Sequence, residues 1–334
     1  MNVGVIGCGM IGQDHIRRLT RVLAGARVTG VADVVPDRAR AVADGLPDAT
    51  VYPSGGKLIR SDDVQAIVVT SWGPTHERYV LAGLAAGKPV FCEKPLAGTA
   101  DACSRIVDSE VGVGRRLVQV GFMRRYDEAY RAMKATVDGG SIGAPLIMHA
   151  AHRNPFTADH FTSDMIVNDT GVHDIDVARW MLGDEVAAVT VLRPRRNRKA
   201  ADGFADPLLM LLEMGSGAVV DVELSLNAGF GYDIRGEVVG EDGTVELSES
   251  AGVIVKGSGA HAGRVPATWQ ERFARAFDTE FQAWLDGVAA GSDATGPSVW
   301  DGYAAAVVCD AGLAALRSGS REPVVLRERP ALYA

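Results

Sequence analysis

Gly7-Cys8-Gly9-Met10-Ile11-Gly12 follows directly on the apolar run Val3 to Ile6 and opens a helical pattern that continues to Ala24. A strand, a glycine-rich turn and a helix in this order are typical of a dinucleotide-binding unit. The first glycine permits the tight turn, the second lets backbone approach a pyrophosphate, and the third lets helix and strand pack closely. The helix N-terminus offers free N–H groups and a positive dipole end, so we expect all of Gly7, Gly9, Met10, Ile11 and Gly12 at the cofactor.

An acidic residue stands where such a unit needs one. Asp33 follows the second strand-like run, Arg27 to Ala32, and lies 21 residues after Gly12. A carboxylate there can accept hydrogen bonds from the ribose hydroxyls of adenosine and would repel a 2′-phosphate, so NAD is favoured over NADP. Asp37 is a rival for this role, and Arg38 would weaken the exclusion of NADP.

The pattern of the first 121 residues predicts an α/β domain with a doubly wound parallel sheet, a Rossmann fold. Short runs rich in Val and Ile alternate with helical stretches such as Thr75 to Ala86, which is typical of buried parallel strands covered by helices on both faces. The predicted strands of this domain are Val3 to Ile6, Arg27 to Ala32, Ala66 to Thr70, Lys88 to Cys92 and Leu117 to Val120.

Residues 122–334 predict a second domain of the α+β class with a large, mainly antiparallel sheet. Gly-containing turns such as Glu241-Asp242-Gly243 join several of its strands and indicate hairpins. Helices are predicted at Tyr126 to Val137, Thr170 to Leu182, Trp269 to Ala289 and Trp300 to Leu316. Strands are predicted at Ala187 to Leu192, Pro207 to Glu213, Ala218 to Leu226, Asp233 to Val239, Thr244 to Leu247, Val253 to Val255 and Pro323 to Leu326.

The loops after the fourth and fifth strands should face the cofactor, because ligands of doubly wound sheets bind outside the carboxyl ends of the strands. These loops contain Ser71, Trp72 and His76, then Glu93 and Lys94. Trp72 fits a contact with the cofactor or packing on the second domain, and His76 fits a cofactor contact or an ordinary polar role.

Oxidation of an alcohol requires a base within reach of the hydroxyl, and two places in the sequence offer one. Lys94 follows a strand and precedes Pro95, where a positively polarised nicotinamide would lower its pKa; the alternative is a surface lysine. Asp169 and His173 are four apart and share a helix face with Asp176, and we expect this face to point away from the buried side of the helix. The carboxylate would then orient the imidazole as proton acceptor. The alternative is that Asp169 caps the helix and His173 lies at the surface.

Composition excludes several classes of function. The formal net charge of −8 argues against a nucleic-acid partner. The basic stretch Arg193 to Lys199 fits a solvated loop, or a contact with an anion or a neighbouring subunit. Four cysteines without metal-ligand spacing indicate a reducing cytoplasm and no metal. We predict no signal peptide and no membrane span.

The motifs resemble the oxidoreductase family that contains glucose–fructose oxidoreductase and inositol dehydrogenase. The glycine motif, Glu93-Lys94-Pro95 and the Asp169/His173 pair mark this family over almost the whole chain. Four stretches resemble inositol dehydrogenases in particular: Thr70 to Pro74, Val118 to Tyr126, Ala151 to Pro155 and Trp300 to Tyr303.

The resemblance implies NAD-dependent oxidation of myo-inositol to the 2-keto inositol, with His173 as base and Lys94 and Asp169 as its partners. It implies a homotetramer, a cis bond before Pro95, and substrate contacts by Arg124, His152, Asn154, Asp176 and Tyr232. Phe277 replaces a tyrosine of some relatives, which would alter the preferred substrate. The alternatives are a dehydrogenase of another cyclic polyol or an aldose, such as scyllo- or chiro-inositol or glucose, or a redox-silent regulator that senses NAD.

Overall fold

The computed structural model describes residues 1–248, 254–257 and 259–334. Contacts within the chain divide it into two compact units. Unit 1 comprises Met1–Phe122, Phe277–Ala306 and Leu326–Ala334, and unit 2 comprises Met123–Ala276 and Val307–Val325. The division differs from the predicted boundary after residue 121 because the chain returns to unit 1 within a late helix and again at its end.

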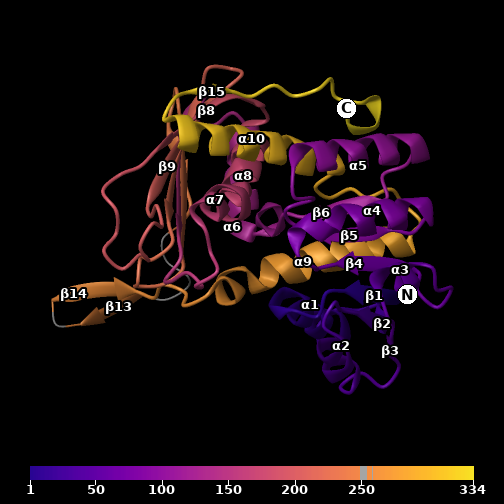
Figure 1. Ribbon diagram of the computed structural model, residues 1–334. Helices are drawn as coiled ribbons and strands as arrows, with labels where there is room; N and C mark the ends of the chain where they lie inside the picture. The colour runs from indigo at the N-terminus through magenta and orange to yellow at the C-terminus, as the bar shows by residue number, and fades with distance from the viewer. Residues whose placement is uncertain (249–253, 258) are drawn as a thin grey trace. The chain divides into compact units, whose positions relative to one another are not determined.

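Unit 1 contains a six-stranded parallel sheet in the order β3-β2-β1-β4-β5-β6 (Figure 1). The order reverses between β1 and β4, which is where a doubly wound sheet binds its ligand. The Rossmann fold expected from the sequence is therefore present. Its strands are β1 Asn2–Ile6, β2 Arg27–Ala32, β3 Thr50–Val51, β4 Ala66–Val69, β5 Val90–Glu93 and β6 Val118–Gly121.

Helices of unit 1 pack on this sheet through small residues and apolar side chains. A Cβ on Gly83 of α4 would lie 2.5 Å from Val90 of β5, so only glycine permits this close approach. Val3, Val5, Val31 and Phe91 are fully buried in the core beside α1 and α9. The helices are α1 Met10–Arg21, α2 Pro36–Ala43, α3 Gly55–Ile59, α4 His76–Ala85 and α5 Ala100–Val113, with short 3-10 turns η1 Gly73–Thr75 and η4 Ala331–Tyr333. The second half of α9 Trp269–Ala289 and the first turns of α10 Val299–Ser318 also belong to this unit.

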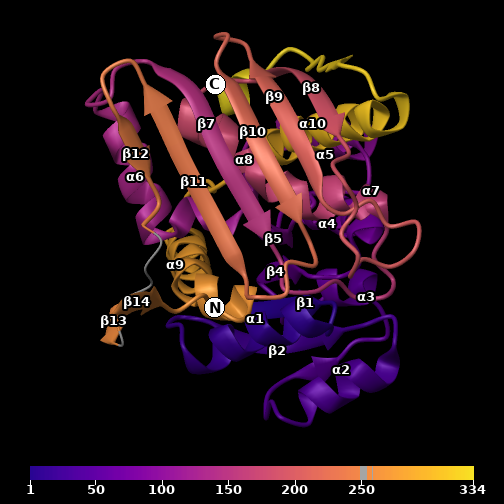
Figure 2. The ribbon, with the colours of Figure 1, turned by 90° about the vertical axis from the view of Figure 1, so that its left-hand side faces the viewer.

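Unit 2 contains a seven-stranded sheet in the order β12-β11-β7-β10-β9-β8-β15 (Figure 2). All its pairs are antiparallel except β7 with β10, so the prediction of a mainly antiparallel sheet is confirmed. The strands are β7 Pro145–Arg153, β8 Val186–Leu192, β9 Leu208–Met214, β10 Val219–Ser225, β11 Asp233–Gly240, β12 Thr244–Glu246 and β15 Glu322–Pro323. A separate hairpin joins β13 Ile254–Gly257 to β14 Ala260–Gly263, and Val253 of the predicted strand lies outside the described residues.

One face of the unit 2 sheet is covered by helices, with α6 Glu128–Asp138 and α8 Val172–Leu182 behind it in Figure 2. Alternate residues of β9 and β10 are buried, and Met210, Val222 and Leu224 form part of this core. A 3-10 turn η2 Met123–Tyr126 precedes α6. The short α7 Ser163–Met165 and a π-helical turn, η3 Ile166–Gly171, lead into α8.

Helix α10 is long and apolar enough to cross a membrane by length and composition alone. Two-thirds of its apolar window, 67%, is buried inside the protein, as in the core helix of a globular domain. The basic stretch Arg193 to Lys199 is mostly exposed, and Arg196 donates hydrogen bonds to the carbonyls of Ala200 and Ala201. This stretch is a loop, as expected from its composition.

Candidate active site

The glycine-rich turn after β1 has the geometry that a bound pyrophosphate requires. Gly7 adopts φ +105°, and a Cβ there would lie 2.5 Å from the carbonyl oxygen of Thr70. A Cβ on Gly12 would lie 2.0 Å from the carbonyl oxygen of Gly7, so helix and strand meet without a side chain between them. By contrast, no described atom lies within 4 Å of a Cβ on Gly9. The backbone of Gly9 is therefore open to a ligand.

Asp33 holds this turn in place. One carboxylate oxygen accepts the backbone N–H of Cys8 at 2.7 Å, and the other accepts the N–H of Val35 at 2.7 Å. Each oxygen keeps a further lone pair that a ribose hydroxyl can use. The rival acid Asp37 lies in the first turn of α2 and pairs with Arg40 at the surface.

Three large apolar side chains surround the carboxyl ends of β1, β2 and β4 and remain exposed. Met10 is 68%, Val34 91% and Trp72 73% exposed. Exposed apolar groups that border an open backbone turn are suited to the flat faces of a dinucleotide. Among the described residues, no side chain caps the N-terminus of α1, which leaves its first N–H groups to a phosphate. Ile11 lies half-buried in the first turn of this helix.

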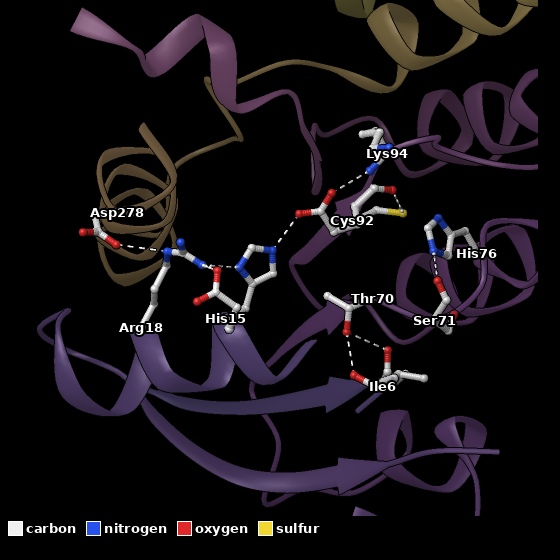
Figure 3. Close-up of polar contacts among 12 residues, drawn as sticks. Ile6, His15, Arg18, Thr70, Ser71, His76, Cys92, Lys94 and Asp278 are labelled. Carbon is white, nitrogen blue, oxygen red and sulfur yellow. Dashed lines mark hydrogen bonds and ion pairs between the residues drawn. The ribbon is translucent and has the colours of Figure 1, made fainter. Parts of the chain in front are cut away.

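His76 is buried and contacts backbone through both ring nitrogens. Its Nε2 is 2.7 Å from the carbonyl oxygen of Ser71 (Figure 3), and its Nδ1 is 2.7 Å from the carbonyl oxygen of Pro95. Burial lowers the pKa of this imidazole, although the two carbonyls act in the opposite direction. Since both ring nitrogens contact backbone, His76 joins the loop after β4 to the loop after β5, which fits the polar role that its position in the sequence also allowed. The hydroxyl of Ser71 is 2.8 Å from that of Thr75.

Lys94 lies half-buried directly after β5, and its bond to Pro95 is cis, as predicted. Its backbone N–H donates to Oε2 of Glu93 at 3.1 Å. Glu93 is itself buried at the carboxyl end of β5, so its carboxylate supports the turn rather than lying open to solvent.

In unit 2, a buried ionic cluster contains two of the predicted substrate residues. Arg124 Nη1 donates to Oδ1 of Asp174 at 2.5 Å, and each side chain is 1% exposed. Nδ1 of His152 lies 2.9 Å from Arg124 Nη2 and 2.8 Å from Oδ2 of Asp174. Burial opposes ionisation of Asp174, but Arg124 and His152 outweigh it and lower the pKa of this carboxyl.

Asn154 directly follows β7, and Tyr232 directly precedes β11, which pairs with β7. The hydroxyl of Tyr232 is 3.4 Å from Nε2 of His152, and burial raises the pKa of this phenol. Asn154 is held by its backbone at the end of β7, where its N–H donates to Ser225. Within the described residues, the buried Oδ1 of Asn154 and Nε of Arg124 have no hydrogen-bond partner.

The predicted Asp169/His173 pair spans the junction of two kinds of helix. Asp169 lies in the π-helical turn η3, and His173 lies half-buried in the first turn of α8. Single π-helical turns inside helices occur frequently at functional sites. The ring of His173 is 6.2 Å from that of His152, so this helix brings His173 beside the buried cluster.

The structure corrects the expectation that this helix directs a carboxylate–imidazole–carboxylate row away from its buried side. Asp176 is 1% exposed and accepts two hydrogen bonds from Arg125, at 2.5 and 3.0 Å. Helix α8 is buried around most of its circumference, and within unit 2 it packs on β7 of the sheet, on α6 and on η2. Amphipathic reasoning therefore placed Asp176 on too exposed a face.

Sequence reasoning missed Asp174, Arg125 and His15, which all form buried polar contacts. His15 carried a usable signal, because it stands beside Ile16 and Leu19 on the apolar side of the first predicted helix. No comparable signal distinguishes Asp174 from Asp176.

No metal centre is evident in the part of the chain that the structure describes, where no group of three or more His, Cys, Asp or Glu side chains could hold an ion. All four cysteines are buried as free thiols, and burial raises the pKa of Cys8 to about 12.

Unit 1 has an open glycine-rich turn and unit 2 has a buried polar cluster, and comparison with known proteins gives the class of the protein. Residues 1–122 match the model of an oxidoreductase family with an NAD-binding Rossmann fold, and residues 134–326 match the model of that family's C-terminal alpha/beta domain. The chain belongs to this oxidoreductase family, and its cofactor is NAD.

Particular relatives cover the whole chain. The inositol 2-dehydrogenase of Burkholderia vietnamiensis is 53% identical over 334 residues, which are 100% of this chain and 99% of the relative. The inositol 2-dehydrogenase 3 of Saccharopolyspora erythraea is 53% identical over 333 residues, 100% of this chain and 98% of the relative. A crystal structure of myo-inositol dehydrogenase from Lactobacillus casei, in complex with NAD(H) and myo-inositol, matches with a TM-score of 0.97 at 38% identity and covers 100% of this chain and 99% of its own.

Proposed function

We propose that this protein is an NAD-dependent inositol 2-dehydrogenase that oxidises myo-inositol to the 2-keto inositol. The observation that carries the proposal is the match, over the whole length of both chains, to a structure that holds NAD(H) and myo-inositol. The open turn at Gly9 and the exposed side chains of Met10 and Trp72 suit the cofactor. When bound, NAD accepts the hydride from the carbon that carries the reacting hydroxyl.

His173 accepts the hydroxyl proton in this proposal. As the C–H bond gives up its hydride, the O–H bond breaks toward the imidazole and a C=O bond forms, so charge and atoms balance. Asp169 orients the imidazole and stabilises its protonated form. Lys94 donates a hydrogen bond to the reacting oxygen and keeps it close to the base.

The remaining hydroxyls of the ring are held by polar groups that unit 2 already fixes. Asn154 supplies an acceptor, and Arg124 supplies a donor. His152, Asp176 and Tyr232 complete the proposed substrate contacts. His152 bonds to Arg124 and Asp174, Asp176 bonds to Arg125, and Tyr232 bonds to His152. These contacts hold the three side chains in fixed orientations, which lowers the entropy cost of ordering them around a polyol.

A steady-state assay of NAD reduction tests the proposal. We expect turnover with myo-inositol to exceed that with scyllo-inositol, chiro-inositol and glucose, and NAD to be preferred over NADP. Removing a general base typically costs about 10²- to 10⁴-fold in rate, so His173→Ala and Lys94→Ala should both lose most turnover. Exposed His160→Ala is the matched control and should keep full activity.

Three outcomes would each contradict a part of this assignment. Absence of NAD reduction with every polyol would favour the redox-silent alternative. Higher kcat/KM for glucose or another inositol isomer would replace myo-inositol but retain the dehydrogenase. Full turnover by His173→Ala would leave the base unidentified.

We further propose a cytoplasmic homotetramer that takes no nucleic acid and no membrane as partner. In the part of unit 2 that the structure describes, no helix covers the second face of the large sheet (Figure 2). Ile147 and Val219 are register partners on neighbouring strands of that sheet, and both are exposed. Sedimentation should give four times the mass of 35.2 kDa, and Ile147→Glu should dissociate the assembly. A monomeric wild type would contradict this.

A further inference from the structure

A buried histidine connects the cofactor helix to the turn that carries Lys94. His15 lies on α1, one turn after the glycine-rich motif, and its side chain is 0% exposed. Its Nε2 is 2.6 Å from Oε1 of Glu93, whose other oxygen accepts the Lys94 backbone N–H (Figure 3). The imidazole and the carboxylate therefore form a continuous hydrogen-bonded path from α1 to Lys94.

Arg18 determines which nitrogen of His15 carries the proton. Nη1 of Arg18 lies 3.2 Å from Nδ1 of His15. A guanidinium can only donate, so Nδ1 is the acceptor and the proton of the neutral ring is on Nε2. His15 therefore donates to the carboxylate of Glu93 and holds it in one orientation.

Two acids hold Arg18 itself in place. Asp14 accepts from Nη1 at 2.5 Å, and Asp278 of α9 accepts from Nε at 3.0 Å. Since Arg18 is buried, these two carboxylates compensate its charge and fix the direction of its donors. Each member of the path from Asp278 to Glu93 is thus oriented by the one before it (Figure 3).

Aromatic rings enclose the imidazole. The ring centroids of Phe281 and Phe277 lie 4.4 Å and 5.5 Å from the ring centroid of His15. The ring of Phe91 lies edge-on to that of His15, with 6.1 Å between the centroids. The guanidinium of Arg18 lies 4.7 Å above Phe277. In these apolar surroundings a hydrogen bond between an imidazole and a carboxylate has no competition from water, so its geometry is well determined.

The neighbouring strand leaves room for the Glu93 carboxylate and for no larger group. Gly121 of β6 is the register partner of Glu93, and a Cβ there would lie 3.2 Å from Cδ and Oε2. His15 on one side and Gly121 on the other therefore confine the carboxylate that supports Lys94.

We propose that His15 is a positioning residue for the dehydrogenase reaction and acts through Glu93 to hold Lys94 in its productive place. Because His15 stands on the helix that follows the phosphate-binding turn, this contact fixes the catalytic lysine relative to the cofactor helix. The inference rests on the role proposed above for Lys94. A misplacement of about 1 Å at a reacting group can cost about 100-fold in rate, so loss of the path should lower kcat.

The test compares two substitutions of His15 and a matched control on the same helix. His15→Gln keeps a side-chain N–H that can reach Glu93, whereas His15→Leu keeps the volume and removes the donor. We calculate kcat from the concentration of sites that bind NAD. On this basis we expect His15→Leu to lower kcat by about 10- to 100-fold and to change the KM for NAD by less than about threefold. His15→Gln should recover most of kcat. The control Arg21→Gln, at an exposed position of α1, should match wild type.

A double variant separates this inference from the proposed role of Lys94. In a Lys94→Ala background, His15→Leu should cause no further loss of the residual turnover, because both act on one group. Additive losses, or full kcat in His15→Leu, would overturn the inference while leaving Lys94 in place. Full turnover by Lys94→Ala would instead contradict the proposed function.

Should His15→Leu fail to fold, Glu93→Gln provides the same test with little change in volume. Glu93 accepts hydrogen bonds from His15 and from the backbone N–H of Lys94. The side-chain amide of the glutamine would direct its own N–H at one of these two donors, so one of the two hydrogen bonds would be lost. We expect the same fall in kcat with an unchanged midpoint of thermal unfolding. Unchanged kcat per NAD-binding site would show that the path is structural only.

Discussion

The carboxylate of Asp33 accepts the backbone N–H of Cys8 at 2.7 Å and thereby ties the end of β2 to the glycine-rich turn. One residue thus has two tasks, since the acid that would accept the ribose hydroxyls also holds the turn that would receive the pyrophosphate. A charged acceptor contributes more to such a turn than a neutral one.

Asp33→Asn should weaken NAD binding by about 10- to 100-fold, which corresponds to the loss of a hydrogen bond to a charged group at about 1.5–3 kcal/mol. It should also reduce the preference for NAD over NADP, because the repulsion of a 2′-phosphate is removed. Titration with both cofactors measures the two effects. The control is the rival acid: Asp37→Asn should change neither, and a larger effect there would move the ribose contact to Asp37.

Substitutions of Gly9 and Gly12 should distinguish an effect on NAD binding from an effect on the stability of the fold. Gly9→Ala adds a Cβ where no described atom lies within 4 Å, so it should leave the unfolding midpoint of the NAD-free protein unchanged and weaken NAD binding. Gly12→Ala places a Cβ 2.0 Å from the Gly7 carbonyl oxygen and should lower that midpoint as well. Equal NAD affinity in Gly9→Ala and wild type would place the pyrophosphate elsewhere.

Much of unit 1 could be predicted because its signals are local. A short apolar run, a glycine turn and an amphipathic stretch recur within a few tens of residues, and β2, for example, matches the predicted range Arg27 to Ala32. The two-residue strand β3 was missed, since so short a run has no readable period.

Strand β7 of unit 2 was also missed, for a different reason. Pro145–Arg153 has exposed Leu146 and Ile147 near one end and buried Ala150 and Ala151 near the other, so neither a period of two nor a continuous apolar run stands out. Its place is decided by pairing with β10 and β11, which the local sequence does not contain.

The candidate site residues also differ in whether the local sequence reveals them. Glu93 and Lys94 were found because they end a strand, but the partners that orient them are distant in sequence. Glu93 bonds to His15 across 78 residues, and Arg124 pairs with Asp174 across 50. Which of several similar acids becomes the partner depends on packing, so Asp174 could not be distinguished from its neighbours.

The buried pair of Arg124 and Asp174 should be a major contributor to the stability of unit 2. Arg124→Met removes the guanidinium from the buried Asp174 carboxylate and leaves it with His152 alone, and removing one partner of a buried ion pair typically costs about 3–5 kcal/mol in the free energy of unfolding. The double variant Arg124→Met/Asp174→Asn removes that charge and should recover part of the loss. Unfolding by urea measures both. The exposed pair of Arg321 and Glu213 is the control, and Arg321→Met should cost less than about 1 kcal/mol.

His76 should make stability depend on pH. Burial lowers the pKa of its imidazole below the ordinary value of 6.5. The unfolded chain therefore binds a proton more readily than the folded protein, so the stabilisation is complete above about pH 6.5 and is lost as the pH falls.

His76→Gln should flatten this dependence, because glutamine can still donate to the carbonyl of Ser71 or Pro95 but does not titrate. Urea unfolding between about pH 7.5 and about pH 5 gives the slope for each protein. Exposed His160→Gln is the control and should retain the wild-type slope. If His76→Gln were as sensitive to acid as wild type, the pKa of His76 would be the same in the folded and unfolded states, because the two backbone carbonyls would then balance the effect of burial.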